Sequence, residues 1–276
     1  PAFTDCDPGA AAVIEFATEV LLPLVESECV MGQVSESWRF EATTCLATFF
    51  AERGADLVPQ EEGSSWLTMS AGQLVLAQPK TPVSGEALSQ VLLYLSLAAV
   101  TGDAAAATFA RKAFRMRYSR LGRGQEHPKS QERPWSSQEL VRLLRCYAAL
   151  EFRDAPVLLA LCNRCLGLVR SLSLQETLQA AQALASLKFR QERLLEELGE
   201  NLVVKHRSDL GLDDIRAALR SWMDLRVPHG GLLAAAEQLL AATEADDSEQ
   251  CVHREVAELI EGFAKVAPPG VHQSGQ

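Results

Sequence analysis

The residues best suited to chemistry lie between positions 111 and 133, where the sequence is strongly basic. This stretch holds eight Lys and Arg residues against two Glu, a local charge of +6 in a chain whose formal net charge is -10. Guanidinium and ammonium groups bind phosphates, and aromatic rings stack on bases. The candidate RNA-binding residues are Arg111, Lys112, Arg115, Arg117, Tyr118, Arg120, Arg123, Lys129 and Arg133. Two other interpretations stay open: a solvated helix end with a basic loop, or a surface that docks an acidic protein.

A pair of thiols in the spacing C-x-x-C, Cys162 and Cys165, is the one arrangement that suggests a metal. On a helix the two side chains share a face. A closed zinc site needs four ligands, and the sequence has neither a second such pair nor a nearby His pair. Cys146 on the preceding helix supplies a third thiol at most. We therefore predict that these thiols pack in the core and that no metal is bound.

Nothing else in the sequence indicates catalysis. The G-x-S-x-G, P-loop and G-x-G-x-x-G patterns are absent. The five His residues are isolated and are expected at the surface or at helix caps; they are His127, His206, His229, His253 and His272. We expect a protein that is not an enzyme and that has no cofactor and no small-molecule substrate. The seven Cys residues, an odd number and scattered, favour a reducing compartment.

The elements that must position the basic segment are predicted to be α-helices. Apolar residues make up 47% of the chain, only 6% of residues are aromatic, and no strong alternation of apolar and polar residues marks a strand. The apolar run from Val91 to Val100 is too short to cross a membrane, so no transmembrane segment is expected. The net negative charge excludes a protein whose whole surface binds polyanions.

One helical sequence pattern occurs three times between Ser136 and Ala236. From Ser136 to Ser173 is 37 positions, and from Leu187 to Leu225 is 38. Ser136 with Glu139, and Ser173 with Glu176, form capping boxes, and Gly211 with Asp214 is a weaker version. Each copy continues into a second apolar helix, at 157–169, 194–204 and 232–240. A period of this length with two helices per repeat predicts an all-α fold, an α-solenoid of helical hairpins.

The repeats divide the chain into segments. We predict an N-terminal helical capping region at 1–83, a degenerate repeat at 84–118, a basic inserted loop at 119–135, three hairpin repeats at 136–242, and a C-terminal capping helix and tail at 243–276. The insertion interrupts the array where the positive charge is concentrated. Polar side chains also recur near one register of the first helices and either contact RNA or form an ordinary solvated stripe, the interpretation we favour; they are Arg142, Arg145, Gln179, Gln182, Arg216 and Arg220.

The clearest copy runs from Ser173 to Leu187, is followed by Phe189 and Arg190, and resembles the octotricopeptide and heptatricopeptide class of helical repeats. That resemblance covers 136–240 and implies an organellar protein that works with RNA, as in the mitochondrial ribosomes of alveolates. The chain departs from the class in its net acidity and in lacking a recognisable C-terminal RAP-type domain. Both departures weigh against an autonomous RNA-processing factor.

Together these features predict a non-catalytic component of a mitochondrial ribonucleoprotein in the matrix, and in the sharpest form a mitoribosomal subunit. The basic segment would contact rRNA or another organellar RNA, and the acidic helices would contact neighbouring proteins of a large complex. The alternative is a protein-only scaffold, or an accessory subunit of a large organellar membrane complex.

Overall fold

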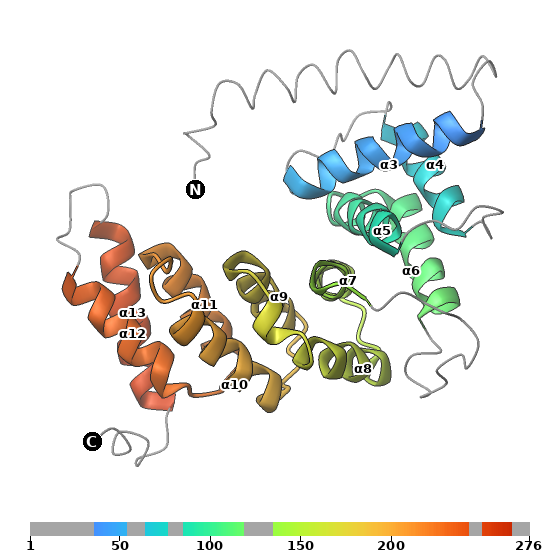
Figure 1. Cartoon of the computed structure of the whole chain (residues 1–276). Coiled ribbons are helices and arrows are strands. Elements are labelled where there is room, and N and C mark those ends of the chain that lie inside the picture. Colours follow the sequence, from blue (N-terminus) through green and yellow to red (C-terminus); the bar gives the residue numbers. More distant parts are fainter. Residues whose placement is uncertain (1–35, 54–63, 77–84, 119–134, 243–249, 267–276) are drawn as a thin grey trace. The chain divides into compact units, whose positions relative to one another are not determined.

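The computed structural model describes residues 36–53, 64–76, 85–118, 135–242 and 250–266, and within them it is all-α (Figure 1). Eleven α-helices, α3 to α13, pack in sequential pairs in these ranges, joined by one short 3-10 helix and one π-helix. They form two compact units, one within residues 1–119 and the other within 120–276. The first part of the predicted capping region, 1–35, and residues 119–134 of the predicted basic loop lie outside the described residues.

The first unit contains α3 (Glu36–Arg53), α4 (Ser64–Leu76), α5 (Gly85–Val100) and α6 (Ala104–Arg117). In it α3 packs on α5 and α4 packs on α6, while α5 contacts all three of the other helices. The helix α5 is buried on several sides because its sequence is almost continuously apolar. The hydroxyls of its buried Ser89 and Ser96 donate hydrogen bonds to backbone carbonyls of the same helix. The helices at 36–53 and 64–76 lie within the N-terminal segment that was predicted to be helical.

A buried hydrogen-bonded chain fixes the start of α6 in the first unit. The Asp103 carboxylate accepts a bond from the amide of Ala106 at 3.0 Å, which caps the helix, and another from the Thr68 hydroxyl of α4 at 2.8 Å. The Thr68 oxygen lies 3.4 Å from the Tyr94 hydroxyl of α5. Burial raises the pKa of Tyr94 to about 12, so the phenol stays neutral. The Asp103 carboxylate thus joins α6 to α4 directly, and Thr68 connects them to α5.

The second unit is built in two layers of helices (Figure 1). The first layer holds α7 (Ser137–Ala149), α9 (Leu174–Ser186), α11 (Leu212–Leu225) and α13 (Gln250–Val266), each packed on the next. The second layer holds α8 (Ala155–Leu166), α10 (Glu192–Glu200) and α12 (Gly230–Ala242). Ser137 at the start of α7 donates to Glu176 at 3.3 Å and Arg145 further along donates to Gln179 at 3.4 Å, so α7 and α9 point the same way.

The predicted capping boxes are present in the second unit. The amide of Ser136 donates to Glu139 at 2.6 Å and the amide of Glu139 donates to the Ser136 hydroxyl at 3.2 Å. Ser173 and Glu176 repeat the two bonds at 2.7 and 3.2 Å. At the third copy Gly211 has no side chain, so only the bond from its amide to Asp214 forms, at 3.2 Å. Each box satisfies amides that the first turn of a helix leaves free.

Two of the three second-layer helices, α8 and α10, end earlier than the sequence predicted. The α-helix predicted at 157–169 stops at Leu166, and a 3-10 turn at Val169–Ser171 follows. The one predicted at 194–204 stops at Glu200 and widens into a π-helix, Asn201–Lys205. The wider turn lets Lys205 donate to the carbonyls of Arg170 and Leu172, at 3.1 and 2.6 Å, and so closes the end of the preceding hairpin. Contacts between neighbouring repeats override the apolar pattern there.

Candidate nucleic-acid interface

The first half of the predicted RNA-binding segment lies on α6. Its buried face consists of Ala106, Ala110, Ala113 and Phe114, and the small alanines let the helix pack closely on α4 and α5. The opposite face exposes Arg111, Lys112 and Arg115. These cations occupy the C-terminal half of the helix, where the helix dipole favours positive charge. We call these three residues the α6 basic face.

The α6 basic face is not neutralised within the described part of the chain. Among the described residues, Arg111, Lys112 and Arg115 form no ion pair and no side-chain hydrogen bond with one another or with any neighbour. Three cations within about one turn of helix therefore face solvent in a chain of net charge -10. Such an arrangement is available to a phosphate chain or to a carboxylate surface.

Tyr118, which the sequence placed among the RNA-binding residues, lies instead in the core of the first unit. Its side chain is 7% exposed and its ring centroid is 5.5 Å from that of Phe114 one helical turn earlier. Stacking on a base would require the ring to leave this packing, so the candidate interface on α6 depends on charge. The side chain of Arg117 and the four residues Arg120, Arg123, Lys129 and Arg133 lie outside the described part of the structure.

The polar stripe on the first-layer helices is brought together in pairs across neighbouring helices. Arg145 of α7 donates to the Gln179 side chain of α9 at 3.4 Å. Arg216 and Arg220 of α11 both bind Glu255 of α13, at 3.2 and 2.8 Å. The shared carboxylate takes up positive charge that a phosphate would otherwise meet, which favours the interpretation as a solvated, helix-joining stripe.

Glu255 is a member of this stripe that the sequence reasoning missed. The repeat spacing could have identified it. Glu255 follows Ala217 by 38 positions, and Ala217 follows Gln179 by the same interval. The last helix was treated as a cap and was not aligned with the first helices of the repeats. Its packing against α11 shows that it extends the first layer.

The cysteine pair on α8 lies in the core, as predicted. Cys162 and Cys165 have no exposed surface, and the same holds for Cys146 on α7. Burial raises the pKa of each of the α8 thiols to about 12, because the thiolate would lose its hydration. Within the described residues no group of three or more His, Cys, Asp or Glu side chains could hold a metal ion.

Of two buried histidines, His229 meets the expectation of a surface or capping position and His206 does not. His229 does cap a helix, since its Nδ1 accepts the amide of Leu232 at 3.1 Å, but it is also buried against Trp222. His206 is buried, and its Nε2 lies 3.1 Å from the carbonyl oxygen of Leu172. Both rings therefore satisfy backbone groups inside the second unit, which their isolation in the sequence did not indicate.

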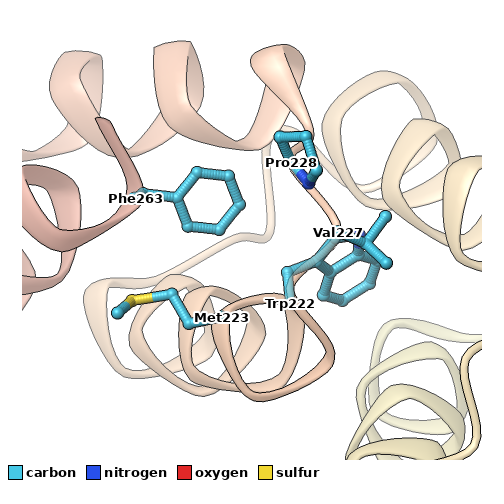
Figure 2. Close-up of a pocket in the computed structure, with 5 residues that line it drawn as sticks. All are labelled: Trp222, Met223, Val227, Pro228 and Phe263. Carbon is cyan, nitrogen blue, oxygen red and sulfur yellow. The ribbon is translucent and has the colours of Figure 1, made fainter. Parts of the chain in front are cut away.

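A small pocket opens between α11, the turn after it and α13 (Figure 2). It holds about 130 Å³ of empty space, part of it open to solvent, and its lining is apolar: Trp222, Met223, Val227, Pro228 and Phe263. No side chain of this lining can act as a nucleophile or a base, and the Met223 thioether is its single possible metal ligand. The pocket therefore offers no site for catalysis.

The chain matches no model of a known protein family and no curated protein. Within the described helices, none is both long and apolar enough to pass through a bilayer.

Proposed function

We propose that this chain is an α-solenoid that contacts RNA as a non-catalytic component of a ribonucleoprotein. The solenoid interpretation is supported by the equivalent caps of α7, α9 and α11 and by the layered packing of successive hairpins. In such an array each repeat contacts mainly its neighbours, and the helices together form an extended surface.

The observation that carries the RNA proposal is the α6 basic face. Arg111, Lys112 and Arg115 are exposed and unpaired among the described residues, on a helix that Asp103 fixes at its start. Phosphate backbones bind through cations of this kind, and the binding is strongest where no internal carboxylate competes. The mitochondrial ribosome is proposed as the particle because of the resemblance to octotricopeptide and heptatricopeptide repeats.

Salt dependence of RNA binding tests this proposal. We expect the full chain to bind single-stranded RNA with an affinity that falls steeply with salt. The triple variant R111A/K112A/R115A should lose about 2 units of the slope of log K against log salt, at about 0.7 per phosphate contact. The three side chains are exposed, so the fold should persist, which circular dichroism verifies. An unchanged affinity and slope in the triple variant would refute the α6 contact.

A protein-only scaffold is the second candidate, and one observation favours it. The α10 helix exposes Glu192, Glu196, Glu197 and Glu200, which repel a phosphate backbone and suit a basic protein surface. Co-sedimentation from organelle extract separates the two candidates. Release of the chain from ribonucleoprotein particles by ribonuclease supports RNA contact, whereas migration with a ribonuclease-resistant protein complex supports the scaffold.

A further inference from the structure

The turns that follow α7, α9 and α11 share an uncommon backbone conformation. Glu151, Lys188 and Arg226 have φ values of 50°, 51° and 54°. They are 37 and 38 positions apart, so they occupy the same place in the three repeats. This left-handed region suits glycine, and a residue with a Cβ is strained in it by roughly 1 kcal/mol. All three positions nevertheless carry a long charged side chain that is exposed.

The fold itself does not use these three side chains. The turns are closed by backbone bonds, from Phe152 to Tyr147 at 2.9 Å, from Phe189 to Leu184 at 3.0 Å, and from Val227 to Trp222 at 3.0 Å. Glycine would make the same bonds with less strain. Within the described residues, the side chains of Glu151, Lys188 and Arg226 form no hydrogen bond and no ion pair. These three charged groups are therefore available to a partner.

The three turns occupy equivalent places in the second unit. Each turn joins a first-layer helix to the second-layer helix that follows it, and α7, α9 and α11 pack one on the next. The exposed charges of these turns and of the helix ends beside them are Arg153, Lys188, Arg190, Arg193 and Arg226 against Glu151, Glu192 and Asp224. Only Arg190 is paired, with Glu192 at 2.7 Å. The turn edge, as we call this set, is thus basic in an acidic chain.

We propose that the turn edge is a second RNA contact, which binds the phosphate backbone of a single strand along successive repeats. The inference rests on the proposed function for the nature of the partner. Exposed cations at equivalent positions of the second and third hairpins suit a chain of regularly spaced negative charges, and long Lys and Arg side chains reach phosphates without reading bases. Glu151 leaves the first turn of the row without this attraction, so Lys188 and Arg226 carry the contact.

The test compares two charge-removing variants of the full chain. We expect K188A/R226A to lower the affinity for labelled oligouridylate and to reduce the slope of log K against log salt by about 1.4, the value for two phosphate contacts. The matched control is R170A/R207A, which removes two exposed cations from the opposite ends of the second-layer helices. Its slope should remain that of the unmodified chain. Equal losses in both variants would mean a nonspecific charge effect and would overturn the proposal.

A glycine variant separates the side chains from the backbone. K188G/R226G should bind RNA as weakly as the alanine pair while having a higher thermal midpoint than that pair, because glycine relieves the strain that alanine keeps. Binding at the unmodified level by either pair overturns the proposal. The proposal is also overturned if either pair of substitutions abolishes binding to polyglutamate and leaves RNA binding intact. The turn edge would then be a surface that docks an acidic protein.

The α6 triple variant keeps this inference distinguishable from the proposed function. Loss of RNA binding in R111A/K112A/R115A with K188A/R226A unaffected would leave the α6 contact standing and refute the turn edge. The reverse result would support the turn edge and refute the α6 contact. Loss in both variants, with R170A/R207A unaffected, would support both contacts.

Discussion

Arg145 of α7 donates to Gln179 of α9, and Arg220 of α11 donates to Glu255 of α13 across the equivalent helix pair. Arg145 and Arg220 each lie nine positions after the start of their repeats, at Ser136 and Gly211. The same register therefore joins first-layer helices at both ends of the second unit. Between them, the register places Gln182 opposite Ala217, whose methyl group cannot accept a hydrogen bond.

The ion pair between Arg220 and Glu255 should contribute stability that depends on the salt concentration. We expect Glu255→Gln to lower the free energy of unfolding by about 0.5 kcal/mol at low salt, because Arg216 and Arg220 lose a shared counter-ion. The loss should shrink at high salt, where exposed charges are screened. Urea denaturation at two salt concentrations measures it. Glu258→Gln, on an exposed site of the same helix, is the control and should have no comparable effect.

A close approach of α4 and α6 depends on Gly72. A Cβ added there would lie 2.4 Å from the ring of Phe109, so the ring would have to move. We expect Gly72→Ala to destabilise the first unit by about 1 kcal/mol net, because overpacking costs about 1–3 kcal/mol and the better helix former returns about 1. Thermal unfolding of the full chain measures it. The orientation of the α6 basic face depends on the same packing.

Two companion variants make the Gly72 prediction specific. Replacing Phe109 by Leu in the Gly72→Ala background should restore part of the lost stability, since the smaller side chain gives the methyl group room. Gly167→Ala should change the stability by less than about 0.5 kcal/mol, because its Cβ would meet only a carbonyl oxygen at 3.4 Å. A harmless Gly72→Ala would contradict the packing described here.

The burial of His229 should make stability depend on pH. Burial lowers the pKa of His229, although the nearby carboxylates of Glu200 and Glu196 oppose that effect. The unfolded chain, with a His pKa near about 6.5, then binds more protons than the folded chain as the pH falls, so stability present above that pH is lost below it. Protonation would also place a hydrogen on Nδ1, which now accepts the amide of Leu232.

The variant that tests this is His229→Asn, because asparagine can cap a helix and does not titrate. Between about pH 7 and 5, the thermal midpoint of the unmodified chain should fall more than that of the variant. His253→Asn, which leaves His229 in place, is the control and should keep the fall. An identical pH profile for His229→Asn and the unmodified chain would show that the ring does not titrate with folding.

The thiols of the described residues should differ sharply in reactivity. Cys45 and Cys251 are exposed, whereas Cys146, Cys162 and Cys165 are buried. At mildly alkaline pH we expect a thiol reagent to modify the exposed pair in the folded chain and the buried three only after unfolding, because burial keeps the reagent away from all three and raises the pKa of Cys162 and Cys165. Peptide mapping after labelling identifies each site. Rapid labelling of Cys162 in the folded chain, or zinc bound in stoichiometric amount, would contradict the core assignment.

The sequence by itself determined the elements of the second unit. Capping boxes and apolar spacing are local signals, since they act over three or four residues of one helix, and they located α7, α9 and α11 correctly. The charge excess at 111–133 was equally visible, because it is a property of composition. The pair of helices at 85–100 and 104–117 falls within the degenerate repeat predicted at 84–118.

Only the tertiary structure decided which of these side chains are available to a partner. Tyr118 is buried because the face of α6 that it shares with Phe114 lies in the core of the first unit, and Arg216 and Arg220 are paired because α13 brings Glu255 beside them. The left-handed turns at Glu151, Lys188 and Arg226 were also hidden, since the sequence signal for that conformation is glycine. The exposure and pairing of these side chains depend on contacts with other helices. A local sequence pattern does not specify those contacts.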